Sequence, residues 1–414
     1  MNSIFQKKIQ TNFSTLNILI FSQYFYPETF IINNISEELQ NKSNIYVVTS
    51  HPSYNIVTKP NYFYSKIKKN NFRKIKITRL PTYPRKKNSY FSIFLNYFTF
   101  IFNGIFYEKK LYPNIKFDLV FVYGTSPIFQ AIPALWFAKK RNTKSILWIQ
   151  DLWPEILSDL KIINNFIILH ILKYFISLIY SKFDLILVQS PDFIKYINKK
   201  ILKKKIITHF NPGKEKIINS IYKKNKPLKI LFTGNIGKAQ SFDTLVNTAI
   251  KIKKENLKII FEVIGEGSMK EWLIRMISRY ELKDFIKVRN HMHQKQLNKY
   301  LLMADGLLIM LKKGEALSST IPAKFQTYLS FGKPLIVSAD GILSDLVKKN
   351  NLGYVSNAEN SLKLYNSILT LAKLPNNKIK KIKNNCLNFF INNFEMKKNC
   401  EKLFFIFKRL TNNN

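Results

Sequence analysis

Cysteine is scarce in this sequence of 414 residues, where only Cys386 and Cys400 occur. Neither has a cysteine or histidine partner at the spacing of metal ligands, so we expect neither a disulfide framework nor a zinc site. A chain without disulfides fits a reducing compartment. The segment from Met1 to Thr15 also lacks the continuous apolar run of a secretory signal, so we do not expect export.

Acidic residues are scarce as well. Against 66 Lys and Arg stand only 25 Asp and Glu, which gives a formal net charge of +41. This imbalance favours a polyanionic partner, whether nucleic acid, an anionic bilayer surface or a phosphorylated substrate. Because 46% of the residues are hydrophobic, the chain can bury a large core, and its length predicts two domains.

Two apolar segments must be assessed as candidate membrane-spanning helices. Tyr90 to Tyr107 runs for 18 residues without a charge, which is the lower limit for a spanning helix. Ile162 to Tyr180 is also apolar but is interrupted by His170 and Lys173. Both run directly into strand-like stretches, so we expect helices packed on a sheet, with faces that contact a bilayer surface, rather than true spans.

Short apolar runs rich in β-forming residues alternate with longer segments along the chain. This alternation predicts βαβ units, an α/β fold class, and parallel sheets covered by helices on both faces. The expected strands form two sets, 16–22, 45–50, 119–123, 145–149 and 185–189, then 229–233, 259–264, 285–288, 306–310 and 334–338.

Glycine use differs between the two sets of strands. Only Gly104 and Gly124 precede residue 213, and the other ten glycines follow, mostly just after strands. Glycine at the carboxyl end of a strand lets the backbone approach a phosphate, so the second set predicts a nucleotide-binding domain. The polar, Lys-rich stretch from Asn198 to Lys226 is interpreted as the junction, and Glu395 to Leu410 as an amphipathic terminal helix.

The first candidate site is FTGNIGKAQ at 232–240, between a strand and a predicted helix. Its glycines, Gly234 and Gly237, and the following Lys238 can place backbone N–H groups and one ammonium around a diphosphate. The spacing fits neither a dinucleotide fingerprint nor a Walker loop, and a plain strand-to-helix turn explains it equally well.

The second candidate site is SSTIPAKFQ at 318–326. Pro322 suits the first turn of a helix, and hydroxyl groups precede it as possible caps. A helix N-terminus there would receive phosphate, with Lys324 adding charge in the first turn. A well-capped structural helix is the alternative interpretation.

Together with VIGEGSMKEW at 263–272 and WIQDLWPE at 148–155, these motifs resemble those of a GT-B glycosyltransferase. More narrowly, they are similar to the retaining glycosyltransferase family 4 enzymes of bacterial surface-polysaccharide assembly, in the subgroup of L-fucosamine transferases. The resemblance extends from Leu16 to about Leu410, with four motifs in the expected order.

The resemblance implies two Rossmann-like, doubly wound domains that face a cleft. Their expected bounds are 1–205 for an acceptor-binding domain, 206–226 for a linker, 227–394 for a nucleotide-sugar-binding domain, and 395–414 for a helix crossing back to the first domain. The donor sugar is a substrate, usually UDP-linked, and no cofactor is implied. No Asp-x-Asp occurs in the chain, which fits a fold that neutralises the diphosphate without a metal.

The resemblance also assigns residues by position. Lys238 and Lys324 are expected to act in catalysis. The residues expected around the diphosphate, ribose and sugar are Gly234, Asn235, Gly237, Gln240, Gly265, Gly267, Ser318, Thr320, Ile321, Pro322 and Gln326.

Two departures from the family pattern are informative. The family often has Arg and Lys where this chain has Asn235 and Gln240, which leaves Lys238 as the local cation. It also often has two glutamates where this chain has Ser318 and Gln326. A serine cannot replace a carboxylate that grips a sugar hydroxyl, so a deoxy or N-acetylated donor is expected.

In the first domain, Asp151 and Glu155 follow a strand directly. Either can orient or deprotonate an acceptor hydroxyl, although an acidic pair favoured by a helix dipole explains them equally well. His291 and His293 follow a strand of the second domain, where solvated loop histidines are more common than residues that border a nucleotide base.

The leading hypothesis is a hexosyltransferase-type enzyme that acts on a lipid-diphosphate-linked glycan acceptor. An anionic membrane surface is a further expected partner, and the expected location is cytoplasmic, peripheral on the inner face of the bacterial plasma membrane. A UDP-sugar epimerase of the same fold is the alternative. A nucleic-acid-binding protein is less favoured, because the basic residues are spread through nearly every segment and the aromatics fall in apolar runs.

Overall fold

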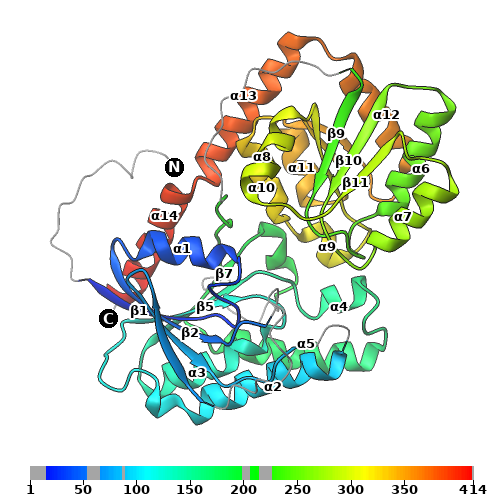
Figure 1. Cartoon of the computed structure of the whole chain (residues 1–414). Coiled ribbons are helices and arrows are strands. Elements are labelled where there is room, and N and C mark those ends of the chain that lie inside the picture. The colour runs from blue at the N-terminus through cyan, green and yellow to red at the C-terminus, as the bar shows by residue number, and fades with distance from the viewer. Residues whose placement is uncertain (1–14, 54–65, 86–88, 198–205, 214–225, 413–414) are drawn as a thin grey trace. The chain divides into compact units, whose positions relative to one another are not determined.

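The computed structural model describes residues 15–53, 66–85, 89–197, 206–213 and 226–412 (Figure 1). The chain divides into two compact units. One comprises Met1–Tyr123, Gln130–Ile146 and Ile406–Asn414, and the other comprises Gly124–Phe129 and Leu147–Phe405. The expected linker at 206–226 falls largely outside the described residues.

The first sheet has eight strands in the order β3-β4-β2-β1-β5-β6-β7-β8. Strand β1 pairs in parallel with β2 and β5, whereas the edge strand β3 pairs antiparallel with β4. The strands are β1 (Leu16–Phe21), β2 (Ser43–Ser50), β3 (Lys68–Phe72), β4 (Ile75–Leu80), β5 (Leu119–Gly124), β6 (Lys144–Ile149), β7 (Leu185–Val188) and β8 (Ile206–Thr208).

The helices in this part of the chain confirm the two expected apolar helices. They are α1 (Ile31–Leu39), α2 (Tyr90–Phe106), η1 (Glu108–Lys110), η2 (Ile128–Gln130), α3 (Ala131–Lys140), α4 (Glu155–Asp159), α5 (Phe166–Ser181) and η3 (Pro191–Lys195). Within the described residues, no helix combines the length and apolar character needed to cross a bilayer.

The second sheet has six strands, all parallel, in the order β11-β10-β9-β12-β13-β14. Its middle strands β9, β12 and β13 are apolar runs, as expected of strands covered on both faces. The strands are β9 (Leu228–Thr233), β10 (Ile259–Ile264), β11 (Ile286–Arg289), β12 (Gly306–Met310), β13 (Leu335–Ser338) and β14 (Gly353–Ser356).

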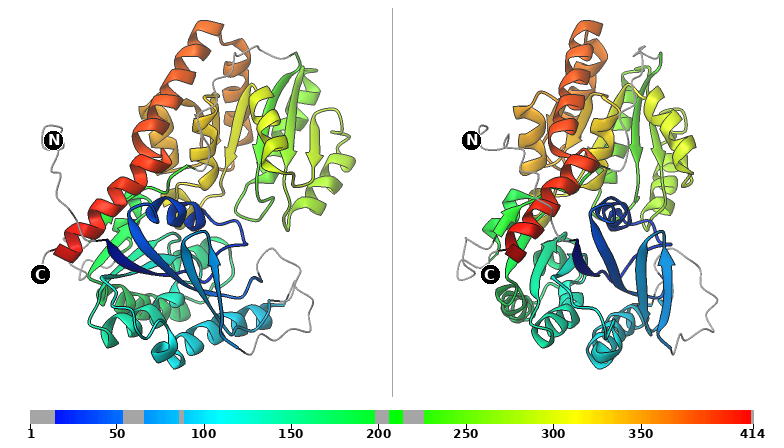
Figure 2. Two further views of the ribbon diagram at one scale, coloured as in Figure 1. Left: turned by 60° about the vertical axis from the view of Figure 1, so that its left-hand side comes forward. Right: turned by 90° about the vertical axis from the view of Figure 1, so that its left-hand side faces the viewer.

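Alternate residues of these strands enter two separate cores. Ile230 and Phe232 of β9 pack with α6, α7 and α12, whereas Leu231 packs with α8, α10, α11 and α13. Figure 2 shows the resulting helices on both faces of this sheet. The helices are α6 (Phe242–Lys254), α7 (Lys270–Arg279), α8 (Gln294–Met303), α9 (Glu315–Ser319), α10 (Ala323–Ser330), α11 (Ile342–Lys349), α12 (Ser361–Lys373), α13 (Asn376–Asn393) and α14 (Met396–Asn412).

The last turns of α14 belong to the first unit. There the ring centroid of Phe407 lies 5.0 Å from that of Phe121 in β5. The terminal helix expected at 395–410 is therefore present as α14, and its end packs on the first sheet.

Candidate functional site

Two glycine loops follow neighbouring strands of the second sheet. The loop after β9 begins at Gly234, and the loop after β10 runs through Gly265 and Gly267. Backbone hydrogen bonds join them: Gly234 N donates to Ile264 O at 2.9 Å, and Ile236 N donates to Glu266 O at 2.8 Å. The loops therefore form one surface at the carboxyl ends of β9 and β10, where open α/β sheets bind ligands.

This close approach explains why glycine is required in the second loop. A Cβ on Gly265 would overlap the carbonyl oxygen of Gly234. A Cβ on Gly267, whose φ is +154°, would overlap the carbonyl oxygen of Ile236. Any side chain at either position would force the two loops apart.

Of the polar side chains of the first loop, one hydrogen-bonds the backbone of the loop and two are exposed to solvent. Gly237 N donates to Gln240 Oε1 at 3.1 Å, so this amide stabilises the turn. Asn235 and Lys238 are exposed. A Cβ on Gly237 would meet the side-chain amide of Asn235, which lies over the loop.

Lys324, in the first turn of α10, reaches this same surface. Its Nζ lies 3.7 Å from the ring centroid of Phe232, and a Cβ on Gly234 would lie 3.7 Å from it. The Nζ atom is buried and has no hydrogen-bond partner among the described residues. Burial lowers the pKa of Lys324 to about 7. A buried amine without a counter-ion is a candidate anion site.

Tyr328 fixes α10 to the end of β9. Its buried hydroxyl accepts a hydrogen bond from Thr233 N at 2.8 Å and lies 3.2 Å from Thr233 Oγ1. Burial raises the pKa of Tyr328 to about 12, so the hydroxyl stays protonated. Sequence reasoning assigned no role to Tyr328, although its position four residues after Lys324 places both on one helix face.

The polar residues predicted around the sugar and ribose bind their own backbone. Ser318 Oγ donates to Glu315 O at 3.0 Å, and Thr320 Oγ1 donates to Ala316 O at 2.7 Å. Gln326 is buried, with its amide oriented so that Nε2 donates to Pro322 O at 3.0 Å and to Ala323 O at 2.9 Å. Ile321 is buried in the core beneath them.

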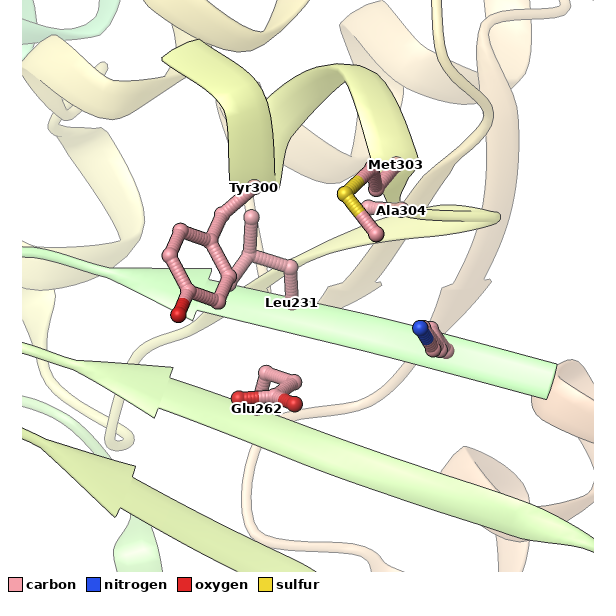
Figure 3. A pocket seen from close by; sticks show the side chains of 6 residues that line it. Leu231, Glu262, Tyr300, Met303 and Ala304 are labelled. Carbon is pink, nitrogen blue, oxygen red and sulfur yellow. The ribbon is translucent and has the colours of Figure 1, made fainter. Parts of the chain in front are cut away.

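A small cavity elsewhere in the second sheet includes none of these residues (Figure 3). Tyr300 and Met303 of α8 face Leu231 of β9 and Glu262 of β10 across it. Glu262 Oε2 already accepts a hydrogen bond from Arg289 Nε at 3.0 Å. The cavity is therefore separate from the glycine loops.

Asp151 lies in the loop after β6. Its Oδ2 accepts hydrogen bonds from Ser126 N at 3.0 Å and Ser126 Oγ at 2.8 Å. Trp153 Nε1 donates to the same Ser126 Oγ at 2.8 Å, so the indole holds the serine in place. Burial raises the pKa of Asp151, which suits a group that exchanges a proton.

Glu155, at the start of α4, lies near a buried tyrosine of α5. Lys173 Nζ lies 3.1 Å from Glu155 Oε1, whereas Oε2 is buried without a hydrogen-bond partner among the described residues. Tyr180 Oη is likewise buried and without a partner in the described chain. Burial, and then the charges of Glu155 and Asp151, raise the pKa of Tyr180, so it remains a hydrogen-bond donor. Sequence reasoning missed Tyr180.

His291 and His293 are exposed in the loop between β11 and α8. The structure places neither of them in the buried surroundings of Lys324. Across the described residues, no group of three or more His, Cys, Asp or Glu side chains is arranged to hold a metal ion.

Comparison with solved structures shows the fold. Sucrose-phosphate synthase from Thermosynechococcus elongatus aligns with a TM-score of 0.74 at 13% identity, over 97% of this chain and 100% of that chain. A glycosyltransferase from Rickettsia africae aligns with a TM-score of 0.67 at 12% identity, over the same shares. HepE from Anabaena, solved in complex with UDP and glucose, aligns with a TM-score of 0.64 at 11% identity, over 95% and 100%.

Comparison of sequences adds a family match. Residues 213–389 match the family model described as "Glycosyl transferases group 1". A curated protein of Escherichia coli K12, the putative colanic acid biosynthesis glycosyl transferase WcaI, is 28% identical over 113 residues. That match spans 27% of this chain and only 26% of the relative's length. The chain thus has the two-domain α/β fold of GT-B glycosyltransferases, and its residues 213–389 are similar to the glycosyl transferases group 1 family.

Proposed function

We propose that this protein is a retaining, metal-independent glycosyltransferase that moves a sugar from a UDP-linked donor to a lipid-linked oligosaccharide. The proposed pathway class is bacterial surface-polysaccharide biosynthesis, such as O-antigen or capsule. The observation that carries the proposal is the buried, unpartnered Nζ of Lys324 beside the loop of Gly234.

Lys324 requires an anion to stabilise its charged form. In the described structure its ammonium lies over the face of Phe232 without a hydrogen-bond partner, and burial lowers its pKa to about 7. A donor diphosphate on the two glycine loops would supply the missing charge. When the bond between sugar and diphosphate breaks, Lys324 would neutralise the charge that develops on the leaving group. Lys238, exposed on the same loop, would add a second cation.

The residues proposed to bind the reacting hydroxyl of the acceptor substrate are Asp151, Glu155 and Tyr180. An acceptor hydroxyl needs an oxygen base that it can hydrogen-bond, and Glu155 Oε2 has no partner among the described residues. Asp151, with its raised pKa, would orient the hydroxyl or take its proton. The protonated Tyr180 would donate a hydrogen bond to the acceptor oxygen or to Glu155.

The proposed donor sugar is an N-acetylated deoxy-amino sugar, such as UDP-N-acetyl-fucosamine or UDP-N-acetyl-quinovosamine. A carboxylate at position 318 would reject a sugar that lacks the hydroxyl it binds, because the carboxylate would then be buried without a partner. Ser318 carries no charge, and its hydroxyl donates to Glu315 O. Discrimination against deoxy sugars is therefore relaxed.

The proposed location is the cytoplasmic side of the bacterial plasma membrane, with the protein held peripherally. The net charge of +41 supports attraction to anionic lipid. Helix α2 carries exposed aromatic side chains, and helix α5 carries exposed aromatic and aliphatic side chains, which supports contact with a bilayer. A lipid-diphosphate-linked acceptor would be presented at that surface.

A panel of UDP-sugars tests the proposed donor. We expect UDP release to be faster with the deoxy-amino donors than with UDP-glucose. The matched variant is Ser318→Glu, which restores the carboxylate and should shift preference toward UDP-glucose. If the native enzyme uses UDP-glucose as well as every deoxy-amino donor, the proposed specificity is wrong.

A further inference from the structure

Helix α2 buries its polar side and exposes its apolar side. Asn96 is fully buried, and its Nδ2 donates to Tyr83 O at 2.6 Å while its Oδ1 accepts from Gln23 Nε2 at 3.0 Å. About two turns later, Asn103 Nδ2 donates to Pro81 O at 2.7 Å. These amide contacts fix the rotation of the helix about its axis. A helix on the surface of a water-soluble protein normally has the opposite arrangement.

The outward side of α2 is a continuous row of phenylalanines. From Phe94 to Phe106, consecutive rings of the row stack with centroids 6.0 to 6.4 Å apart and interplanar angles of 9° to 17°. At 100° per residue, all five exposed rings fall within an arc of about 120°. We call this row the α2 phenylalanine face, and its members are Phe91 (71% exposed), Phe94 (61%), Phe98 (54%), Phe102 (57%) and Phe106 (67%).

The surroundings of this face are basic and amphipathic. Lys109 and Lys110 lie in η1, just beyond the end of α2, and Lys110 Nζ lies 5.4 Å from the ring centroid of Tyr107. Helix α3, which lies beside α2 (Figure 1), carries the exposed Trp136 with Lys140 Nζ 4.9 Å over its ring. Tryptophan and tyrosine paired with lysine are typical of the boundary between hydrocarbon and headgroups.

The charges beside the α2 phenylalanine face favour an anionic partner. Glu108, the acidic residue next to α2, is buried and bonded to Arg141, with Nε to Oε1 at 2.7 Å. Lysines therefore dominate the charge at this end of the helix. A second copy of the chain would bring the same positive charge to the contact and repel it, whereas anionic phospholipid would attract it.

We propose that the α2 phenylalanine face docks on an anionic bilayer surface, with the rings among the acyl chains and the lysines among the headgroups. The helix of 17 residues would lie along the interface. This inference rests on the proposed membrane location and deepens it by naming the surface that makes the contact. It does not depend on which sugar is transferred.

Vesicle co-sedimentation tests the docking. The probes are sucrose-loaded vesicles of phosphatidylethanolamine with 30 mol% phosphatidylglycerol, and vesicles of phosphatidylcholine alone. We expect tight binding to the first and weak binding to the second, and a loss of roughly 100-fold in partitioning for the variant Phe94→Ser/Phe98→Ser/Phe102→Ser. The matched control, Ile274→Ser/Met303→Ser/Leu362→Ser, removes three similarly exposed apolar side chains elsewhere and should bind as the native protein does.

The readouts separate this inference from the proposed function. UDP release from a soluble donor should be equal in the native protein and the phenylalanine variant. Native binding to vesicles without any UDP release would leave the docking intact and refute the glycosyltransferase proposal. Equal vesicle binding by the native protein and the phenylalanine variant would overturn the docking.

A second measurement does not depend on the triple variant folding. Phe98→Trp adds a fluorophore in the middle of the row, and lipids brominated within the acyl chains should quench the added fluorescence. An unquenched signal, or a stable dimer in the absence of lipid that persists with vesicles, would assign the face to a second copy and overturn the proposal.

Discussion

Among the individual residues, Lys324 is the one on which the proposed donor site depends most. Sequence alone placed it in the first turn of a helix after Pro322, and the structure confirms that position in α10. The burial of its Nζ, the contact with Phe232 and the lack of a partner among the described residues all arise from tertiary packing between α10 and β9. No local sequence pattern encodes those three features, so they were not predicted.

Donor affinity should depend on pH through Lys324. In the free protein, burial lowers the pKa of this amine to about 7, so it loses its proton as the pH rises above 7. A bound diphosphate favours the ammonium form and raises that pKa again, so binding takes up a proton. We expect the affinity for a UDP-sugar to be flat below pH 6 and to fall about tenfold per unit above pH 7.

Isothermal titration calorimetry in buffers of different ionisation enthalpy measures that proton uptake. At pH 8 we expect close to one proton taken up by the native protein and none by Lys324→Met. Lys313→Met, which removes an exposed lysine instead, should behave as the native protein does. Equal uptake in Lys324→Met would assign the titrating group elsewhere.

For the elements, the attachment of α10 to β9 depends on one hydroxyl. Tyr328→Phe leaves the buried Thr233 N–H without its partner and should lower the free energy of unfolding by about 1–3 kcal/mol. The loss should also weaken donor binding, because α10 carries Lys324. Urea denaturation and donor titration check both effects, with Tyr280→Phe as the exposed control. Unchanged stability would show that the hydroxyl contact is not needed.

The contact between the two glycine loops gives a second test of the proposed donor site. Gly265→Ala places a methyl group against the carbonyl oxygen of Gly234, so the loops must separate and donor affinity should fall at least tenfold. Gly306→Ala instead places its methyl group against the side chain of Leu371, within the core. That control should lower stability while the folded protein keeps its donor affinity, and a normal affinity in Gly265→Ala would contradict the proposed loop site.

The ten expected strands are all present, because each is an apolar run with β-forming residues. Four strands were not expected. The edge strand β3 (KKNNF) is polar and largely exposed, and β8 has only three residues. β4 (IKITRL) contains two charged residues, Lys76 and Arg79, and β14 (GYVS) has only four residues, of which only Ser356 is fully buried. Each depends on pairing with a neighbour, which a single segment does not reveal.

For the whole molecule, the proposed reaction proceeds without a divalent metal. The fold would neutralise the leaving diphosphate with Lys324, Lys238 and the backbone amides of the glycine loops. We expect UDP release to be unchanged by EDTA and by added Mn²⁺. Activity that EDTA abolishes and Mn²⁺ restores would refute this part of the proposal.

The candidate site was only partly predictable from sequence. Motif order placed the glycine loops and Lys324 in one domain, and the structure brings Gly234, Gly265 and Lys324 together. Tyr328 and Tyr180 were missed because tyrosines at helical spacing are usually core residues. The inverted polarity of α2 was also missed, since Asn96 and Asn103 receive their partners from segments distant in sequence.

The central claim is that Lys324 and the glycine loops bind the diphosphate of a UDP-linked donor. The most direct test measures UDP binding through the thermal shift that UDP causes in the native protein and in Lys324→Met at pH 7. A ligand at about 100 times its dissociation constant stabilises the folded state by roughly 2.7 kcal/mol. We expect UDP to stabilise the native protein to this extent and to bind Lys324→Met at least tenfold more weakly, with Lys313→Met unchanged. A native protein that UDP does not stabilise, or a Lys324→Met variant that binds UDP as tightly as the native protein, would contradict the account.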